Sequence, residues 1–268
     1  MMIRTAALQL HVKPGDTVEN FNKAAGCIRE AAAKGADLIV LPELPITGYG
    51  LTEENYHSLA EAFSGSLITS FQELARELQT VLVVPFAEKY ESRLFISAAI
   101  IERTGSLLSV YRKSFLWGNE KRIFSSGKKC YKPVETSLGK IGILICADAE
   151  FPEPSRLLAL QGADLIVVPS VWSLEAESRW DIQLPARALD NTVFVMGVNT
   201  VHEGSCGKSK FVRPDGAVLK EAPRDGESLL IEDLDFTIIK NIRKAVPYLQ
   251  DLPASFYNFP LIENNPEN

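Results

Sequence analysis

The stretch KGADLIVLPE at residues 34–43 recurs almost unchanged as QGADLIVVPS at residues 161–170. Each copy follows a segment with helical spacing of apolar residues. Gly35 and Gly162 stand where a helix end favours a residue that tolerates the left-handed conformation. The LIV run in each copy is short, branched and uninterrupted, which is typical of strands buried on both faces. The repeat therefore predicts two helix-to-strand units and an internal pseudo-twofold architecture.

The surrounding segments predict a layered α/β fold. Before the first copy, apolar residues recur at i, i+3, i+4 and i+7, namely Phe21, Ala24, Ala25, Ile28, Ala31 and Ala32. Before the second copy, a helix is expected to begin near Glu153 and to carry Leu157, Leu158 and Leu160. Further buried strands are predicted at 80–88, 94–102, 141–148 and 192–199, and the turn-like EKYESR predicts a hairpin between the first two. Helices would thus cover a mixed sheet in a single domain.

The two ends of the chain differ in composition. Residues 1–240 are predicted to form the folded domain, and residues 241–268 a C-terminal extension. The extension, NIRKAVPYLQDLPASFYNFPLIENNPEN, is rich in Pro and Asn. We expect an extended tail that docks on a partner subunit through Tyr248, Phe256, Tyr257 and Phe259.

Composition excludes several classes of protein. The chain has 268 residues, of which 46% are hydrophobic and 23% charged, as in ordinary globular proteins. A net charge of −6 and scattered Lys and Arg residues argue against a nucleic-acid or anionic-membrane surface. No apolar run approaches the ~18 residues of a membrane helix, and the N-terminus lacks the features of a signal peptide. Free thiols in a reducing cytoplasm are expected, because Cys27, Cys130, Cys146 and Cys206 form no CxxC pair.

Three polar residues lie at the ends of predicted strands, where sheets of this type place reactive groups. Glu43 follows LIVLP, Glu88 follows LVVPFA, and Cys146 comes near the end of IGILIC. Each alone has an ordinary structural explanation. A single Cys in an apolar strand is usually core packing, and a Glu after a strand is usually a solvated loop residue or a helix cap. A catalytic interpretation therefore needs further residues.

Other chemistries find less support in the sequence. His11, His57 and His202 have no ligand spacing to one another or to a Cys pair, so no metal or other cofactor is expected. GKS at 207–209 resembles the end of a phosphate loop, but the glycine required five residues upstream is His202. A papain-like pair of Cys146 and His202 remains open, although nothing else around His202 resembles an active-site strand end.

A carboxylate and an ammonium group could also serve a cysteine nucleophile. The thiol must lose its proton, and a positive group must hold the developing oxyanion. Glu43 could be the base if burial raises its pKa towards neutrality. Lys113, in SVYRKSFLW, lies between a Tyr–Arg pair and aromatic residues, which allows a partly enclosed ammonium. Taken alone, Lys113 would be interpreted as a surface lysine in a basic turn.

Three fragments surround these residues: LPELPITGYG around Glu43, YRKSFLW around Lys113 and GILICADAEFPE around Cys146. Their order, with 70 residues from 43 to 113 and 33 from 113 to 146, resembles the Glu–Lys–Cys triad of the nitrilase superfamily of carbon–nitrogen hydrolases. Further matches are FAE at 86–88, GNEKRIFSSG at 118–127, GADLIVVPS at 162–170 and GKSKFVRPDG at 207–216. The resemblance covers roughly residues 3–235.

The resemblance implies a fold and a set of catalytic roles. The fold would be a four-layer αββα sandwich with mixed sheets, assembled into a homodimer or a larger homo-oligomer. Cys146 would be the nucleophile, on a strained strand-to-helix turn, with Glu43 as general base and Lys113 as oxyanion stabiliser. Glu120, in NEKRIF, would be the additional active-site carboxylate that positions substrate and assists proton transfer.

The residues after the nucleophile indicate a branch of this family. Amidase-type members commonly show C-Y-D-x-x-F-P-E, which this chain matches except for Ala147 in place of Tyr, whereas strict nitrilases show Trp–Glu after the Cys. Carbamoylases of amino acids carry arginines where this chain has Ala149 and Glu150, so an anionic substrate is disfavoured. The resemblance implies that the N–H of Ala147 completes the oxyanion hole and that Ala147, Glu150 and Trp172 contact substrate.

The sequence therefore predicts a cytoplasmic amidase of the nitrilase superfamily that releases ammonia from a neutral or cationic small-molecule carboxamide through a thioester. The first alternative is a hydrolase of an N-carbamoyl compound. A nitrilase and a non-catalytic binding module on the same fold are the others. Glu150 has two open roles: a charge filter that repels anions, or a first-turn acid at the start of the helix before Pro152.

Overall fold

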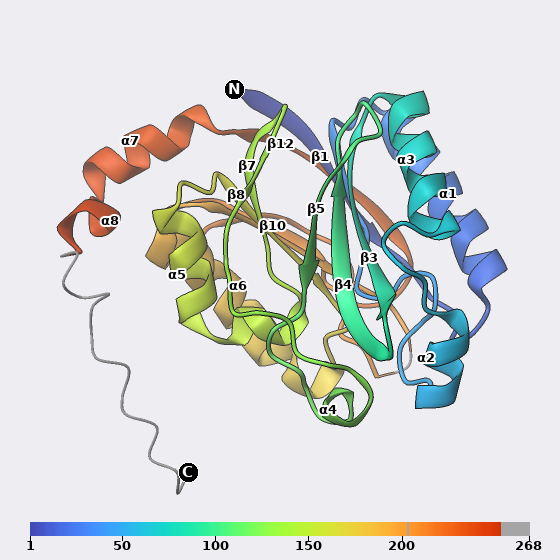
Figure 1. Ribbon diagram of the computed structural model, residues 1–268. Helices are drawn as coiled ribbons and strands as arrows, with labels where there is room; N and C mark the ends of the chain where they lie inside the picture. The colour runs from blue at the N-terminus through green and yellow to red at the C-terminus, as the bar shows by residue number, and fades with distance from the viewer. Residues whose placement is uncertain (203, 253–268) are drawn as a thin grey trace, which may run out of the picture.

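The structure is a computed structural model that describes residues 1–202 and 204–252, in which two β-sheets pack face to face (Figure 1). The strands of sheet A are β1 (Met2–Gln9), β2 (Leu38–Val40), β3 (Val81–Tyr90), β4 (Arg93–Ile101), β5 (Leu107–Arg112) and β12 (Ser228–Asp235). The strands of sheet B are β6 (Val134–Thr136), β7 (Gly139–Ile143), β8 (Leu165–Ser170), β9 (Phe194–Asn199), β10 (Lys210–Val212) and β11 (Val218–Glu221). Their spatial orders are β12-β1-β2-β3-β4-β5 and β11-β10-β9-β8-β7-β6.

Both sheets share one pattern of strand directions. β1, β2 and β3 are parallel in sheet A, as are β7, β8 and β9 in sheet B. One antiparallel strand borders each trio on one side (β12 or β6), and two border it on the other (β4 and β5, or β10 and β11). β2 and β8 carry the two LIV runs and occupy equivalent central positions. The predicted pseudo-twofold architecture is therefore confirmed.

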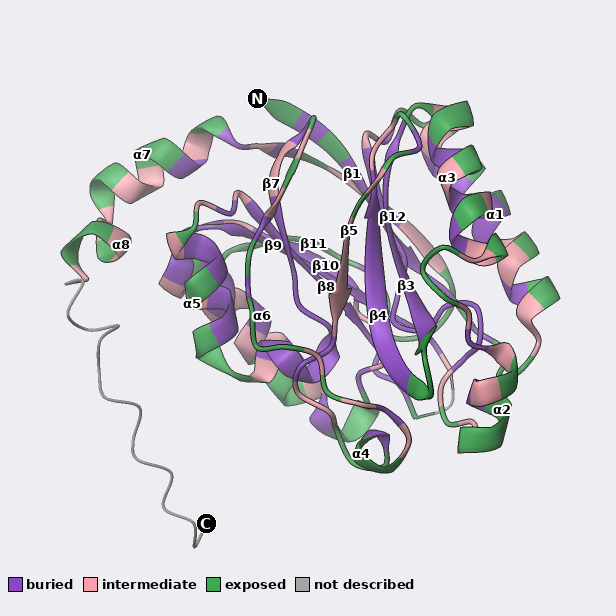
Figure 2. Cartoon of the chain, viewed as in Figure 1, coloured by how far each residue is buried: buried purple, intermediate pink, exposed green. Residues whose placement is uncertain are grey.

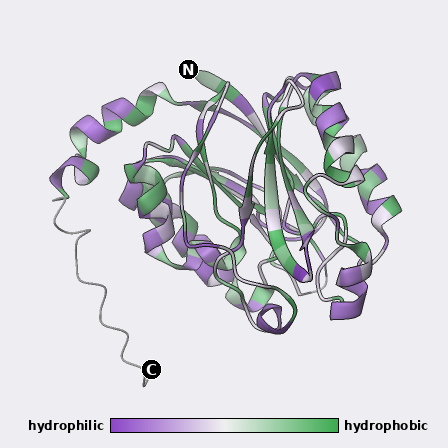
Figure 3. Ribbon diagram, in the orientation of Figure 1, coloured by the Kyte–Doolittle hydropathy of each residue, from purple (hydrophilic) through white to green (hydrophobic). Residues whose placement is uncertain are grey.

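Helices cover the outer faces of the sheets, which completes the predicted αββα sandwich (Figure 1). Helices α1 (Thr17–Ala33) and α3 (Ser66–Leu78) pack on sheet A, and α5 (Pro152–Leu160) and α6 (Glu177–Asn191) pack on sheet B. The short helices α2 (Glu53–Leu59) and α4 (Glu120–Ile123) lie near one end of the sandwich. Buried residues are concentrated in the strands and on the inner stripes of the helices (Figure 2), and the strands are the most hydrophobic elements (Figure 3).

Strand β2 shows why its sequence is apolar at every position. Leu38 and Val40 face the core between the sheets, whereas Ile39 faces the core beneath α1 and α3. Successive strand residues point to opposite faces, so a strand covered on both sides needs an unbroken apolar run.

The turns predicted around the repeats form as expected. Gly35 and Gly162 have φ of +83° and +89°, a conformation that glycine adopts without steric cost. Helix α1 begins after Asp16, whose carboxylate accepts the backbone N–H of Glu19 at 3.2 Å. The hairpin between β3 and β4 is also confirmed, with Tyr90 paired to Arg93.

Two elements differ from the sequence-based prediction. Strand β7 ends at Ile143, so the strand predicted over 141–148 stops three residues before Cys146 because the chain turns out of the sheet there. The extended conformation predicted from residue 241 is wrong, because α7 (Thr237–Ala245) and α8 (Tyr248–Asp251) are helical. α7 is strongly amphipathic, and its apolar Ile239 is buried. Phe256, Tyr257 and Phe259 lie outside the described residues.

No helix in the described part of the chain is both long enough and apolar enough to cross a bilayer.

Two glycines should respond oppositely to substitution by alanine. At Gly197 in β9, a Cβ atom would overlap the side chain of Leu184 and lie 2.7 Å from Trp180 of α6, so Gly197→Ala should cost about 1–3 kcal/mol of unfolding free energy. At Gly26, on the exposed face of α1, a Cβ atom would meet nothing within 4 Å, so Gly26→Ala should add up to about 1 kcal/mol. Urea unfolding of both variants tests the helix–sheet packing. Equal stability of the two would contradict it.

Candidate active site

Four of the predicted site residues converge at one end of the two sheets. Glu43 comes three residues after β2, and Lys113 directly follows β5, so sheet A supplies both. Cys146 comes three residues after β7 of sheet B, and Glu120 is the first residue of α4. All four side chains are buried. The site therefore exists only when the two sheets are docked.

A buried ammonium lies between two buried carboxylates. Lys113 Nζ donates to Glu43 Oε1 and to Glu120 Oε1, both at 2.8 Å. The second oxygen of each carboxylate accepts a backbone N–H, from Val171 to Glu43 and from Trp117 to Glu120, both at 2.9 Å. These contacts fix both carboxylates and direct the lysine.

The cluster carries one more negative than positive charge in a dry environment, which sets its proton affinities. Burial raises the pKa of Glu43, and the nearby Glu120 adds to this shift while Lys113 opposes it. Burial and the negative charge of Glu43 raise the pKa of Cys146 well above that of an ordinary thiol. Burial would lower the pKa of Lys113, but Glu43, Cys146 and Glu120 together raise it. The resting site thus holds a neutral thiol beside a carboxylate and a permanent ammonium.

Cys146 occupies a strained turn. Its φ is +48°, a left-handed conformation that costs a residue with a side chain about 1–2 kcal/mol. It opens a 3₁₀ helix at Cys146–Glu150, and its Sγ lies 3.9 Å from the carbonyl oxygen of Val171. Leu44, next to Glu43, has the same φ of +48°. Strained backbone therefore flanks both the thiol and the carboxylate, as is common at functional sites.

Asp148 braces the nucleophile turn against the segment that carries Lys113. One carboxylate oxygen accepts the backbone N–H groups of Ser114 and Phe115 at 3.0 and 2.8 Å, and also the Ser114 hydroxyl. The other accepts the Tyr111 hydroxyl at 2.7 Å and the backbone N–H of Ile145 at 3.0 Å. Burial raises the pKa of Asp148, and these hydrogen bonds oppose that shift. Asp148 thereby holds the two catalytic segments at one separation.

A cavity of about 210 Å³ opens onto the thiol. The predicted contact residues Ala147, Glu150 and Trp172 all line it together with Cys146. The indole of Trp172 is itself buried, and its N–H donates to the carbonyl of Ala176 at 2.9 Å. Trp172 therefore forms a rigid wall of the cavity.

Glu150 is paired with a cation that the sequence pattern did not indicate. Arg179 of α6 lies 3.0 Å from the Glu150 carboxylate and over the ring of Trp117. Arg179 also lines the cavity. The charge of Glu150 is therefore partly compensated, which weakens the sequence-based argument that it repels anionic substrates.

Sequence reasoning missed several residues of the site. Tyr49 donates its hydroxyl to Glu120 at 2.7 Å, and it could have been noticed in LPITGYG, six residues after Glu43. Trp117 could have been noticed in the same way, because it ends YRKSFLW, four residues after Lys113. Arg179 has no comparable signal, because only the fold brings it to the cavity. His202 also lines the cavity, yet the charged groups that act on Cys146 are Glu43, Lys113 and Glu120.

Glu88, the third polar residue at a predicted strand end, does not join this cluster. It is buried within β3 and forms two short hydrogen bonds with Arg112, at 2.7 and 2.6 Å.

The chain is similar to known proteins over nearly its whole length. The family model for carbon-nitrogen hydrolase matches residues 4–244. An (R)-stereoselective amidase from Pseudomonas sp. is 32% identical, over 91% of this chain and 89% of its own. An N-carbamoylputrescine amidase from Arabidopsis thaliana is 30% identical, over 90% of each chain. A double mutant of an amidase from Nesterenkonia sp. AN1, solved in complex with acrylamide, superimposes with a TM-score of 0.85 at 27% identity, over 96% of both chains.

Removing a hydrogen-bond acceptor from Asp148 should lower the free energy of unfolding and change the accessibility of Cys146. In Asp148→Asn one accepting oxygen becomes an NH₂ group, so at least one buried donor loses its partner, at a cost of about 1–3 kcal/mol in unfolding free energy. The rate at which iodoacetamide alkylates Cys146 should also change. Tyr111→Phe, which loses a single hydrogen bond, should show smaller effects of the same kind. Urea unfolding and alkylation kinetics measure both, and wild-type values in Asp148→Asn would contradict the bracing role.

Proposed function

The chain belongs to the carbon–nitrogen hydrolase family, and we propose that it hydrolyses a small-molecule carboxamide to ammonia and a carboxylic acid through a thioester on Cys146. The observation that carries this proposal is the buried Lys113 held by Glu43 and Glu120, within electrostatic range of the Cys146 thiol. A binding module would gain nothing from burying these charged groups, since each is costly to desolvate.

In the first half of the reaction, the thiol attacks the amide carbon. The raised pKa of Cys146 keeps the thiol protonated at rest, so Glu43 takes its proton as the sulfur–carbon bond forms. The carbonyl oxygen becomes an oxyanion that Lys113 Nζ and the backbone N–H of Ala147 stabilise. A donor of this kind typically contributes about 10²–10³ in kcat. The proton on Glu43 then passes to the nitrogen, and the carbon–nitrogen bond breaks to release ammonia.

In the second half, water hydrolyses the thioester. Glu43, again a carboxylate, removes a proton from the water as it attacks the acyl carbon, and the same donors hold the second oxyanion. Its collapse releases the carboxylic acid, and the proton returns to the sulfur. Glu120 receives hydrogen bonds from Lys113, Tyr49 and the N–H of Trp117, so it positions Lys113. We propose that it also positions the substrate and assists proton transfer.

The cavity suggests the shape of the acyl group. A volume of about 210 Å³, with Tyr49, Trp117 and Trp172 among its walls, suits a short acyl chain with apolar or flat surfaces. The small side chain of Ala147 leaves room beside the thiol. The Glu150–Arg179 pair places both signs of charge at the wall, so we propose a neutral or zwitterion-tolerant site.

A second candidate is hydrolysis of an N-carbamoyl compound. The Arabidopsis thaliana relative named N-carbamoylputrescine amidase favours it. The chemistry is the same at Cys146, but the carbamoyl thioester would release carbon dioxide together with ammonia. Measuring both products across amides and N-carbamoyl amines separates the two candidates.

We further propose a cytoplasmic homodimer or larger homo-oligomer, with residues 241–268 at a subunit interface. The four free cysteines suit a reducing compartment. Exposed apolar residues on the outer helices, among them Leu157, Ile182 and Leu189, are compatible with burial by another subunit.

The acyl intermediate should be found on one cysteine only. Wild-type protein quenched in acid during turnover of a carboxamide should show, by mass spectrometry, the acyl group on the peptide that contains Cys146. Cys146→Ala should remain folded and release no ammonia. Cys27→Ala, at a half-buried thiol of α1 that lines neither the cavity at Cys146 nor its neighbours, should turn over normally. An adduct on Cys27, Cys130 or Cys206, or ammonia release by Cys146→Ala, would refute the mechanism.

The Glu150–Arg179 pair should set the charge preference for substrates. Arg179→Ala leaves Glu150 uncompensated, so kcat/KM should rise for 5-aminovaleramide and fall for glutaramate. Glu150→Gln should do the reverse. The changes should be about twofold to fivefold, as for a partly exposed ion pair, while valeramide changes little. Equal effects on all three amides would show that Glu150 acts only at the start of the helix.

A further inference from the structure

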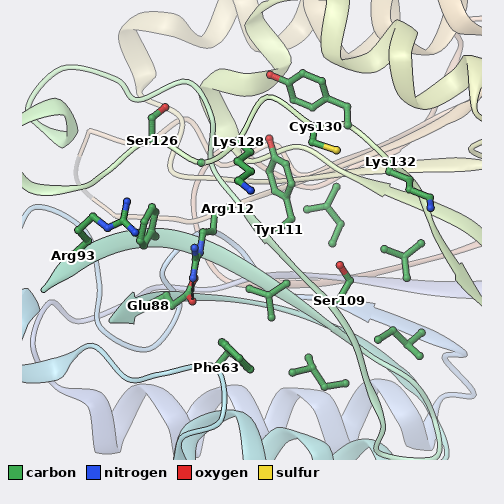
Figure 4. Close-up of a pocket in the computed structure, with 18 residues that line it drawn as sticks. Phe63, Glu88, Arg93, Ser109, Tyr111, Arg112, Ser126, Lys128, Cys130 and Lys132 are labelled. Atoms are coloured by element: carbon green, nitrogen blue, oxygen red, sulfur yellow. Dashed lines mark hydrogen bonds and ion pairs between the residues drawn. The ribbon is translucent and has the colours of Figure 1, made fainter. Parts of the chain in front are cut away.

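Another cavity lies away from the thiol and is larger than the one that opens onto it. It has a volume of about 710 Å³ and is lined by β5, by residues 126–128 and 130–132, and by parts of β3, β4, β6 and β7 (Figure 4). β5 and β6 are the edge strands of the two sheets, so the cavity occupies an open edge of the sandwich. None of Glu43, Lys113, Glu120 and Cys146 lines it. Its volume falls in the range of small-molecule sites.

One part of this cavity is cationic. Arg112 is held by the fully buried Glu88, which also accepts a hydrogen bond from Ser97 at 2.6 Å. Arg112 lies over the ring of Phe95 at 4.2 Å, and Arg93 approaches the same ring at 5.4 Å. In Figure 4, Arg93, Arg112 and Glu88 lie toward one side of the cavity. Both carboxylate oxygens of Glu88 therefore accept hydrogen bonds from Arg112 and fix its orientation.

The remaining cations of the lining have no acidic partner among the described residues. Within residues 1–202 and 204–252, Arg93, Lys128 and Lys132 form no ion pair. The lining thus has an excess of positive charge in a chain whose net charge is −6. A concave surface with this local excess favours an anion.

The other part of the cavity is apolar. Leu107 and Leu108 begin β5, and Val134 and Ile143 come from β6 and β7. Arg112 is five residues along β5 from Leu107, which separates them by roughly 16 Å at the usual rise of a strand. A ligand that satisfies both parts has an anionic head and a hydrocarbon or aromatic body.

The cavity wall is hydrogen-bonded to the catalytic segments. Tyr111 and Tyr131 line the cavity, and their hydroxyls bond to Asp148 and to the Ser114 side chain, both at 2.7 Å. The N–H of Gly127 donates to the carbonyl of Lys113 at 2.8 Å. A Cβ atom at Gly127 would overlap the backbone of Arg112, so this contact is close. A ligand that contacts Tyr111 or Gly127 could therefore shift the backbone around Lys113 through these hydrogen bonds.

We propose that this cavity binds a small amphipathic anion, and that its occupancy changes the rate of reaction at Cys146. The binding half is independent of the proposed amide hydrolysis, and only the rate effect rests on it.

Calorimetry with the full chain tests the binding half. The probes are two amphipathic anions with different head groups, 4-phenylbutyrate and phenyl phosphate. Two controls each lack one part of these molecules: 4-phenylbutan-1-ol has no anionic head group, and inorganic phosphate has no aromatic body. One or both of the amphipathic anions should bind more tightly than either control. Comparable binding of the alcohol, or no binding of either anion, would overturn the proposal.

Substitutions at exposed positions locate the site. Arg93→Ala and Lys128→Ala should each weaken binding about tenfold, or ~1.4 kcal/mol. Lys129→Ala is the matched control, because this neighbour of Lys128 lies over the Phe115 ring and does not line the cavity. Circular dichroism verifies that each variant is folded. An anion that binds at Cys146 would be insensitive to Arg93→Ala, and that result would overturn the assignment.

The rate effect is tested separately. At an anion concentration equal to the wild-type Kd, kcat for valeramide and the alkylation rate of Cys146 should change in the wild type and much less in Arg93→Ala, which binds the anion about tenfold more weakly. An unchanged kcat and alkylation rate in the wild type would reject the coupling and leave a binding site only. Alkylation needs no substrate, so this readout survives if the protein does not hydrolyse valeramide.

Discussion

A buried lysine shared by two buried glutamates is the interaction on which the rest of the structure depends. Taking three charges out of water is costly, and one ammonium cannot neutralise two carboxylates. The cost is offset only where Lys113, Glu43 and Glu120 meet at hydrogen-bond distance, with backbone N–H groups on the outer oxygens. Loops from sheet A, α4 and the end of β8 must therefore arrive at one point. Burial, together with the negative charge of Glu120, raises the pKa of Glu43 and so favours its accepting a proton.

The same requirement explains the strained backbone. A regular strand would keep Cys146 and Glu43 in the cores, so the chain must turn abruptly after β7 and β2. Cys146 and Leu44 take left-handed conformations there, and hydrogen bonds to Asp148 and from Val171 hold the turns in place. Stability is thus given up locally to bring these two side chains together at one end of the sheets, and the surrounding contacts restore it.

Much of this could be predicted from the sequence, because the informative features are local. The unbroken LIV runs, the glycines after helices and the fragments around Glu43, Lys113 and Cys146 all lie within about ten residues each. What the sequence did not reveal depends on distant contacts. Arg179 reaches Glu150 only because α6 packs beside the nucleophile turn, and Tyr49 reaches Glu120 across 71 residues. The helices α7 and α8 were missed because Pro and Asn beyond them dominated the composition of the segment.

The two repeats meet at equivalent residues that differ in chemistry. Glu43 and Ser170 are the tenth residues of the two GADLIV repeats, and they touch across the pseudo-twofold axis, with the N–H of Glu43 3.4 Å from the carbonyl oxygen of Ser170. The first repeat has an acid at this position. The second has a serine there, followed by Val171, whose backbone N–H donates to that acid. A nearly symmetric scaffold thus meets at an asymmetric junction, with a single carboxylate that one half supplies and the other half orients.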